Sequence, residues 1–171
     1  MPELQRLRAD HADSVLAFEL ANRAYFAGFI SDRGDEFFDQ FAEQHADMLA
    51  QQESGSCAFH VLVREDGTVL GRFNLFGLED GTAELGYRVA QDVAGQGVAT
   101  ATVQELCRLA AAQYGVRMIR ARTTSANVAS QRVLIKAGFD VAGPAEINGQ
   151  PATGYQRDLS AVSPGQPDDA H

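Results

Sequence analysis

Apolar residues recur along this chain with two different periods, and the changes between them predict an alternation of helices and strands. Within residues 35–52, Phe37 and Phe41 follow helical spacing, and another helix is expected over residues 11–25. Large apolar side chains on one stripe of a helix usually pack against a core. The N-terminal part therefore predicts two core-packed helices, separated by a loop at residues 26–34.

Shorter apolar runs, bounded by turn residues, predict strands. The pairs Asp66-Gly67 and Asp80-Gly81 are strong hairpin signals, and the last two strands are expected on either side of Asn148-Gly149. Two steps of strand and helix follow the second pair, with helices expected over residues 98–114 and 127–138. The expected strands cover residues 3–8, 57–64, 69–78, 82–90, 117–123, 139–143 and 153–159.

This order of elements belongs to the α+β class, and we expect a single domain over residues 1–159. A chain of 171 residues can bury one substantial core, and its hydrophobic content of 45% is ordinary for a globular domain. We find no internal repeat. The tail, residues 160–171, contains Pro164, Pro167 and paired aspartates and is expected to be disordered.

The most informative stretch is a turn with two glycines between a predicted strand and a predicted helix. Gly95 and Gly97 lack a Cβ, so the main chain can adopt left-handed conformations and a ligand can approach it closely. The helix that follows offers its first N–H groups and the positive end of its dipole. Together these features predict a binding site for a phosphate or diphosphate group.

Two common phosphate-binding motifs do not fit this turn. A P-loop requires Gly-Lys-Ser/Thr, whereas Gly97 is followed by Val98 and Ala99. A dinucleotide-binding turn would have a third glycine where Thr100 stands, and an acidic residue about 20 positions further on. The residues at that distance, around Ile119, carry no carboxylate. We therefore expect a different phosphorylated ligand.

A second informative stretch follows the strand predicted at residues 117–123. Asn127 is a good N-cap, and Gly138 suits the residue just after a helix. The run from Asn127 to Phe139 resembles the signature Asn-x-x-Ser-x-Arg/Lys-x-Leu-x-Lys-x-Gly-Phe of the GNAT superfamily of acyltransferases, at every named position. The glycine turn resembles the family's acetyl-CoA diphosphate loop, Arg/Gln-x-x-Gly-x-Gly/Ala, with Ala94 in place of Arg or Gln.

The resemblance is closest to the branch of ribosomal-protein N-terminal acetyltransferases (Rim-type). In that branch the strand before the diphosphate loop commonly reads Glu-Leu-Gly-Tyr, which is the sequence from Glu84 to Tyr87. The family resemblance implies a mixed central sheet of about seven strands, flanked by about four helices. It also implies that the fourth and fifth strands splay apart to admit acetyl-CoA.

Acetyl-CoA is the co-substrate that the resemblance implies, and the family's binding residues carry over to matching positions. Main-chain N–H groups of the turn would hold the diphosphate, the backbone of residues 87–89 would pair with the pantetheine, and the amide of Asn127 would contact the pantetheine or acetyl region. Arg132 and Lys136 would supply charge for the phosphates, or are solvated residues of a surface helix. The expected cofactor-binding residues are Tyr87, Arg88, Val89, Ala94, Gly95, Gln96, Gly97, Val98, Ala99, Thr100, Asn127, Ser130, Arg132 and Lys136.

Acetyl transfer to an amine needs a neutral amine, stabilisation of the developing oxyanion and a proton for the departing thiolate. The resemblance implies Ser130 as the general acid, although a helical hydroxyl can also bond locally. Glu84 and Glu146 are alternative general bases, or solvated carboxylates. Asn74 and Tyr155, on strands expected to flank the acceptor cleft, are expected to orient the substrate.

The sequence thus predicts an N-acetyltransferase that passes the acetyl group directly to a primary amine, with a protein N-terminus as the first choice. A small amine such as an amino acid, polyamine or antibiotic is the alternative within enzymes. A non-catalytic acyl-CoA-binding regulatory module is the alternative of a different class. The loops at residues 26–34 and 146–154 would decide between acceptors.

Composition limits the partners and the location. The net charge of −9 argues against nucleic-acid binding. No apolar run is long enough for a transmembrane helix, and the N-terminus does not resemble a signal peptide, so we expect a cytoplasmic protein away from membranes. Cys57 and Cys107 lack metal or redox spacing and are expected to be reduced and buried, with no metal site. A monomer or a homodimer is expected.

Overall fold

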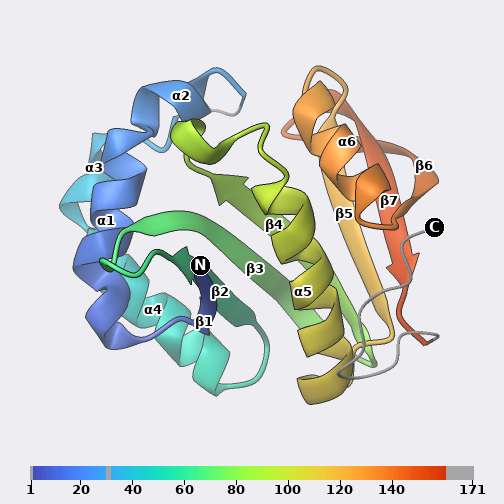
Figure 1. Cartoon of the computed structure of the whole chain (residues 1–171), viewed down its shortest axis with the longest axis horizontal. Coiled ribbons are helices and arrows are strands. Elements are labelled where there is room, and N and C mark those ends of the chain that lie inside the picture. The colour runs from blue at the N-terminus through green and yellow to red at the C-terminus, as the bar shows by residue number, and fades with distance from the viewer. Residues whose placement is uncertain (1, 30–31, 161–171) are drawn as a thin grey trace. The chain divides into compact units, whose positions relative to one another are not determined.

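The seven strands of this computed structural model, which describes residues 2–29 and 32–160, form one mixed sheet (Figure 1). Their order is β1-β2-β3-β4-β5-β7-β6, which confirms the seven-strand sheet expected from the sequence. The strands are β1 Glu3–Arg6, β2 Ala58–Val63, β3 Val69–Glu79, β4 Thr82–Val89, β5 Met118–Thr124, β6 Asp140–Ile147 and β7 Gln150–Asp158. The predicted tail lies outside the described residues, apart from Ser160.

The contacts between residues divide the chain into two compact units. Unit 1 comprises the described residues within 1–74 and 87–94, and unit 2 comprises those within 75–86 and 95–171. β3 and β4 therefore each contribute residues to both units.

The described residues of unit 1 form four α-helices where the sequence predicts two: α1 Ala12–Ala21, α2 Arg23–Ala27, α3 Asp35–Asp39 and α4 Phe41–Glu53. Two short 3-10 helices, η1 Ala9–His11 and η2 Gln91–Val93, also belong to this unit. The first predicted helix is interrupted at Asn22, whose side-chain amide donates to the carbonyl of Phe18 at 2.9 Å. A side chain that bonds to nearby main chain competes with the helical pattern, which explains the break. The second predicted helix is interrupted at Gln40, whose φ of −106° is not helical.

A buried side-chain amide links the elements that form the core of unit 1. The side chain of Gln52, in α4, donates to the carbonyl of Leu7 and accepts from the N–H of Phe59, both at 2.9 Å. These two hydrogen bonds connect α4 to Leu7, which follows β1, and to Phe59 in β2. The strands β1 and β2 pair with each other in antiparallel fashion. The side chains of Val15, Phe59 and neighbouring apolar residues fill the space between these elements.

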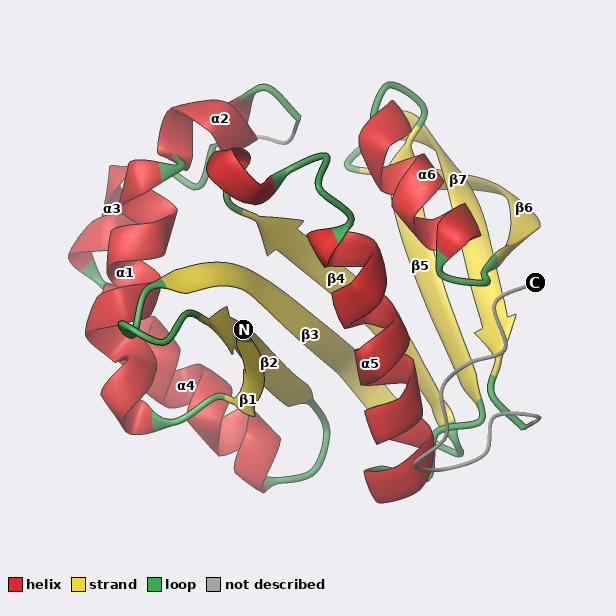
Figure 2. Cartoon of the chain, in the orientation of Figure 1, coloured by secondary structure: helices red, strands yellow, loops and turns green. Residues whose placement is uncertain are grey.

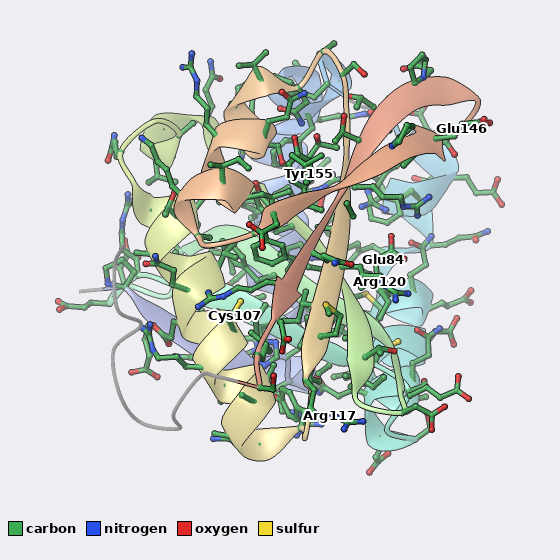
Figure 3. All side chains as sticks on the ribbon, turned by 90° about the vertical axis from the view of Figure 1, so that its right-hand side faces the viewer. Glu84, Cys107, Arg117, Arg120, Glu146 and Tyr155 are labelled. Atoms are coloured by element: carbon green, nitrogen blue, oxygen red, sulfur yellow. The ribbon has the colours of Figure 1, made fainter. Side chains whose placement is uncertain are left out.

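Unit 2 is built on β5, which pairs in parallel with the first half of β4 and in antiparallel with β7. The helices α5 Val98–Gln113 and α6 Val128–Lys136 lie on the same side of β5 (Figures 2 and 3). Their buried side chains, among them Leu106 and Leu134, cover that face of the sheet.

The hairpin of β6 and β7 turns at Asn148 and Gly149, as predicted. Both residues have a positive φ, 50° and 79°, which is the conformation of a two-residue hairpin turn. Because such a turn lets pairing begin immediately, β6 extends to Ile147 and β7 starts at Gln150. The strands predicted at residues 139–143 and 153–159 are therefore too short at this turn.

The parallel pairing of β4 with β5 runs from Thr82–Met118 to Leu85–Ala121 and ends there. β5 continues to pair with β7 as far as Thr124. Over residues 2–29 and 32–160, no helix is both long and apolar enough to cross a membrane.

Candidate active site

The glycine turn leads into α5 with the geometry that an anion site requires. Gly95 and Gly97 are left-handed, with φ of 76° and 79°, and Gly97 is the N-cap of α5. A Cβ atom at either glycine would meet no other atom within 4 Å, so the main chain is open on that side. The first turn of α5 contains no acidic residue. Helix geometry leaves the N–H groups of Val98, Ala99 and Thr100 without a carbonyl partner inside the helix. The features that would accept a diphosphate are therefore present.

Asn127 caps α6, as predicted. Its Oδ1 accepts a hydrogen bond from the N–H of Ser130 at 3.2 Å, and among the described residues its Nδ2 group donates none. Gly138 follows the helix with a φ of 97°, which confirms its predicted place after the C-terminus. Because the cap uses only the carbonyl oxygen of the Asn127 amide, its two N–H donors can still serve a ligand.

Gln131 anchors this helix start to β5, a role that the sequence analysis missed. Its side-chain amide donates to the carbonyls of Thr124 and Ser125, both at 3.1 Å. The positions of Asn127 and Ser130 are thus fixed relative to the end of β5. Arg132 and Lys136 lie exposed on the same helix.

The two candidate bases are linked by a residue that the sequence analysis did not identify. The guanidinium of Arg122, on β5, contacts Oε1 of Glu84 through Nε and Nη2, both at 2.9 Å. Its Nη1 donates to the main-chain carbonyl of Glu146 at 3.0 Å. Arg122 therefore holds the Glu84 carboxylate in place and connects it to β6, whereas the Glu146 side chain is exposed.

Strand register explains which of these side chains share a face. Glu84 lies opposite Arg120, and side chains alternate along a strand, so Glu84, Arg120 and Arg122 lie on the face away from α5 and α6. Figure 3 shows Glu84 and Arg120 on one side of β5 and Cys107, in α5, on the other. The sequence analysis did not predict that Arg120 and Arg122 lie on the face of Glu84. Their alternation in the sequence places them on one face of β5, but the parallel pairing with β4 is needed to bring that face beside Glu84.

Tyr155, predicted to orient the acceptor, lies on the opposite face from Glu84. It pairs with Ala121 in the β5–β7 ladder and is only 5% exposed. Asn74, the other predicted acceptor residue, is half-buried on β3 in unit 1. The structure therefore does not bring Tyr155 to the face that carries Glu84.

The last residues of β4 belong to unit 1, with Ala94 after them. The ring of Tyr87 stacks on Phe73, with centroids 5.6 Å apart and planes at 5°. The guanidinium of Arg88 lies 3.3 Å from Oε2 of Glu19 and 4.7 Å from the centroid of the Phe26 ring. Arg88 therefore points toward α1 and α2, where the sequence alone gave no reason to expect it.

Both cysteines are free and buried, as predicted. Burial raises the pKa of the Cys107 thiol to about 11, and this outweighs the nearby Arg157. A thiol with so high a pKa is almost wholly protonated at neutral pH and is a poor nucleophile. The described part of the chain contains no cluster of three or more histidine, cysteine or acidic side chains suited to a metal ion.

Comparison with known proteins defines the class. Residues 3–140 match the model of the acetyltransferase (GNAT) domain family, so the chain belongs to this family. The probable N-acetyltransferase YjcK of Bacillus subtilis is 27% identical over 150 residues, which cover 83% of this chain and 82% of the relative.

Solved structures share the fold at low sequence identity. A ribosomal-protein-S5-alanine acetyltransferase from Vibrio fischeri has a TM-score of 0.86 at 16% identity, with 95% of this chain and 96% of that chain covered. RimJ of Mycobacterium smegmatis, in complex with CoA-disulfide, has a TM-score of 0.82 at 20% identity, with coverages of 96% and 84%. These structures confirm the predicted GNAT fold. Membership of the family identifies the protein as an acetyl-CoA-dependent N-acetyltransferase.

Proposed function

We propose that this enzyme transfers the acetyl group of acetyl-CoA directly to the N-terminal amine of a protein. The observation that carries the proposal is the pair of left-handed glycines at the start of α5, together with the Asn127-capped α6. Solved relatives with this fold include acetyltransferases whose names specify ribosomal proteins, which favours a protein N-terminus as acceptor.

In this proposal the main chain of the turn binds the diphosphate of the co-substrate. Gly95 and Gly97 have a positive φ and leave the main chain of the turn open, and the dipole of α5 adds to the attraction of its N–H groups for an anion. Ala94 supplies only main chain, so the diphosphate depends on the N–H groups from Gly95 to Thr100. Gln96, Arg132 and Lys136 are exposed polar residues that can reach solvent-facing phosphates.

In unit 1, the pantetheine would pair with the main chain of Tyr87, Arg88 and Val89. In unit 2, the Asn127 amide is the proposed donor to the pantetheine or acetyl region. In the reaction, the amine nitrogen attacks the thioester carbon, the carbon–sulfur bond breaks, and the sulfur takes a proton. Ser130 is the proposed source of that proton. A main-chain N–H near Val89 is the proposed donor to the oxyanion, an interaction usually worth a few kcal/mol (about 3).

The amine must lose a proton before or during attack, and Glu84 is the preferred base. Its carboxylate is held by two contacts from Arg122, whereas the Glu146 side chain has no partner among the described residues. A group held in one position is better placed for proton transfer than one that samples many. Glu146 remains the alternative. Direct transfer, without an acetyl-cysteine, agrees with the burial and raised pKa of Cys107.

A small amine is the second candidate acceptor, because a spermidine N-acetyltransferase chimera also shares the fold, with a TM-score of 0.76 at 16% identity. The experiment that separates the two is a screen of N-terminal peptides and small amines with acetyl-CoA, in which released thiol is measured. Turnover with peptides alone supports the proposal, and turnover with small amines alone contradicts it. Release of thiol without any acceptor sets the background. No turnover with either class, while CoA still binds, would favour a regulatory acyl-CoA-binding module.

A further inference from the structure

Unit 1 contains a small cavity that is open to solvent. It is enclosed by α1, α2, the segment at residues 32–33, α3 and β4. Phe26, Ala27 and Phe38 supply apolar walls, and the remaining lining side chains are charged. A pocket with apolar walls and a few convergent charges is suited to a small organic ion.

The floor of the cavity is formed by a buried carboxylate that two arginines share. Glu19, in α1, is 2% exposed, and its carboxylate oxygens lie 3.3 Å from Nη1 of Arg72 and 3.3 Å from Nη1 of Arg88. One carboxylate cannot neutralise two guanidinium groups. Burial lowers the pKa of Arg88 to about 10; Glu19 opposes this effect, while Arg33 and Arg72 add to it. The buried group therefore carries a surplus of positive charge.

On the rim of the cavity, Arg23 is fully neutralised. Its Nε and Nη2 contact the two carboxylate oxygens of Asp32 at 2.9 and 2.8 Å, and Nη2 also contacts Asp35 at 2.9 Å. This bidentate pairing engages both oxygens of Asp32. Both carboxylates of Asp32 and Asp35 thus pair with Arg23, and neither forms an ion pair with Arg88 or Arg72.

Arg33 adds a second uncompensated charge. Its guanidinium lies 4.8 Å from the centroid of the Phe37 ring, and it forms no ion pair with any carboxylate of residues 2–29 and 32–160. It is close enough to Arg72 and Arg88 to lower the pKa of both. Three arginines and two carboxylates thus line this cavity, in a chain that has 23 acidic and only 14 basic residues. Arg72 and Asp35, which pair with lining residues, add one charge of each sign.

We propose that this cavity binds a carboxylate of the amine acceptor through Arg33 and Arg88, so that the enzyme prefers acceptors with an acidic group close to the amine. The inference rests on the proposed function. Guanidinium groups favour a planar carboxylate, which they can contact through two nitrogens, and they repel an ammonium group. The acceptor's amine would therefore lie outside this cavity.

Arg88 connects the cavity to the co-substrate within unit 1. It lies between Tyr87 and Val89, on the segment of β4 proposed to line the pantetheine. A molecule whose carboxylate reaches Arg88 is therefore bound beside that segment. For a peptide, this means an acidic side chain within the first few residues of the N-terminus.

The test compares acceptor peptides that are identical except for one Glu or Gln, placed at the second, third or fourth position. The wild-type enzyme should prefer the Glu peptide at one of these positions by about tenfold in kcat/KM, mainly through KM. Arg33→Gln should bring the two peptides within about twofold, and Arg33→Lys should retain part of the preference. Arg64→Gln, at an exposed arginine outside the cavity, is the matched control and should keep the full preference.

A wild-type enzyme that treats Glu and Gln alike at all three positions would overturn the inference, as would a preference that survives Arg33→Gln. A binding measurement keeps this result separate from the proposed function. Calorimetry with the N-acetylated Glu and Gln product peptides requires no turnover. One outcome is that no peptide is acetylated, while the Glu product binds more tightly than the Gln product and does so only when Arg33 is present. In that case the cavity is a site for acidic ligands, and the proposed acceptor class is wrong. Equal binding of both products would refute the cavity's role.

Discussion

Arg122 contacts the carboxylate of Glu84 with two of its nitrogens and the main chain of Glu146 with the third. At the scale of single residues, this contact is what distinguishes the two candidate bases. A carboxylate held by two contacts from one guanidinium keeps its position. The contact therefore favours Glu84 over Glu146 as the group that receives the amine proton, directly or through water.

Glu84→Gln is expected to lower kcat by about 100-fold, since the amide keeps the shape of the side chain but cannot accept the amine proton. CoA affinity, measured by calorimetry, should stay unchanged. Glu79→Gln, at an exposed position on β3, is the control for loss of a negative charge. Full activity of Glu84→Gln together with a large loss in Glu146→Gln would assign the base to Glu146.

Ser130→Ala tests the proposed general acid. A CoA thiol with a pKa near 8.5 is a tolerable leaving group, so we expect a moderate loss in kcat, about tenfold. The loss should be larger with substrates whose leaving thiol is more basic. Ser125→Ala, in the exposed segment before α6, is the matched control. Activity of Ser130→Ala that equals the wild type with every thioester would exclude this role.

At the scale of elements, the sequence identifies the ends of helices and turns better than their interiors. The N-cap at Asn127, the glycine after α6 and the turn at Asn148-Gly149 follow from local residue chemistry, and the structure confirms them. The breaks at Asn22 and Gln40 are not visible in the pattern, because apolar spacing continues across both. Asn22 interrupts its helix through a side-chain bond and also accepts a hydrogen bond from the N–H of Gln91, which only the folded chain supplies.

Gly97→Val tests the start of α5 as a diphosphate site. Valine rarely adopts a φ of 79°, and its side chain would occupy the open side of the turn, so CoA affinity should fall at least tenfold (about 1.4 kcal/mol). Gly115→Val is the matched control, since Gly115 lies beyond the other end of α5, also has a positive φ, and also faces open space. Both variants should lose similar stability, and only Gly97→Val should lose CoA binding. A comparable loss of CoA affinity in both variants would contradict the site.

At the scale of the whole molecule, the family and its order of elements could be predicted from three short motifs. The features that could not be predicted depend on contacts between residues that are far apart in the sequence. The cluster of Glu19, Arg72 and Arg88 joins α1, β3 and β4, and no spacing in the chain indicates it. The same holds for Tyr155, whose face depends on its register with Ala121. Contacts between polar residues that are far apart in the sequence can be predicted only when the order of the strands in the sheet is known.

The stability of the fold should depend on pH through His60, which is buried in β2 at 1% exposure. Burial lowers its pKa from 6.5 to about 4, a shift that Arg6 reinforces and a hydrogen bond with the main chain of Phe73 opposes. Burial also lowers the pKa of His11. Between pH 6.5 and 4, His60 is protonated in the unfolded chain but not in the folded chain. The free energy of unfolding therefore has its full value above pH 6.5 and decreases as the pH falls through this range.

The contribution of His60 to this loss is on the order of 3 kcal/mol at pH 4. Chemical denaturation at pH 7.5, 6, 5 and 4 should give a free energy of unfolding that declines across this window. His60→Leu should flatten the decline, because leucine fills the site and takes up no proton. Phe59→Leu, at the neighbouring position of β2, is the control for a disturbed core and should lower stability by a similar amount at every pH. Parallel pH profiles for the wild type and His60→Leu would mean that this histidine is protonated in the folded protein as readily as in the unfolded chain.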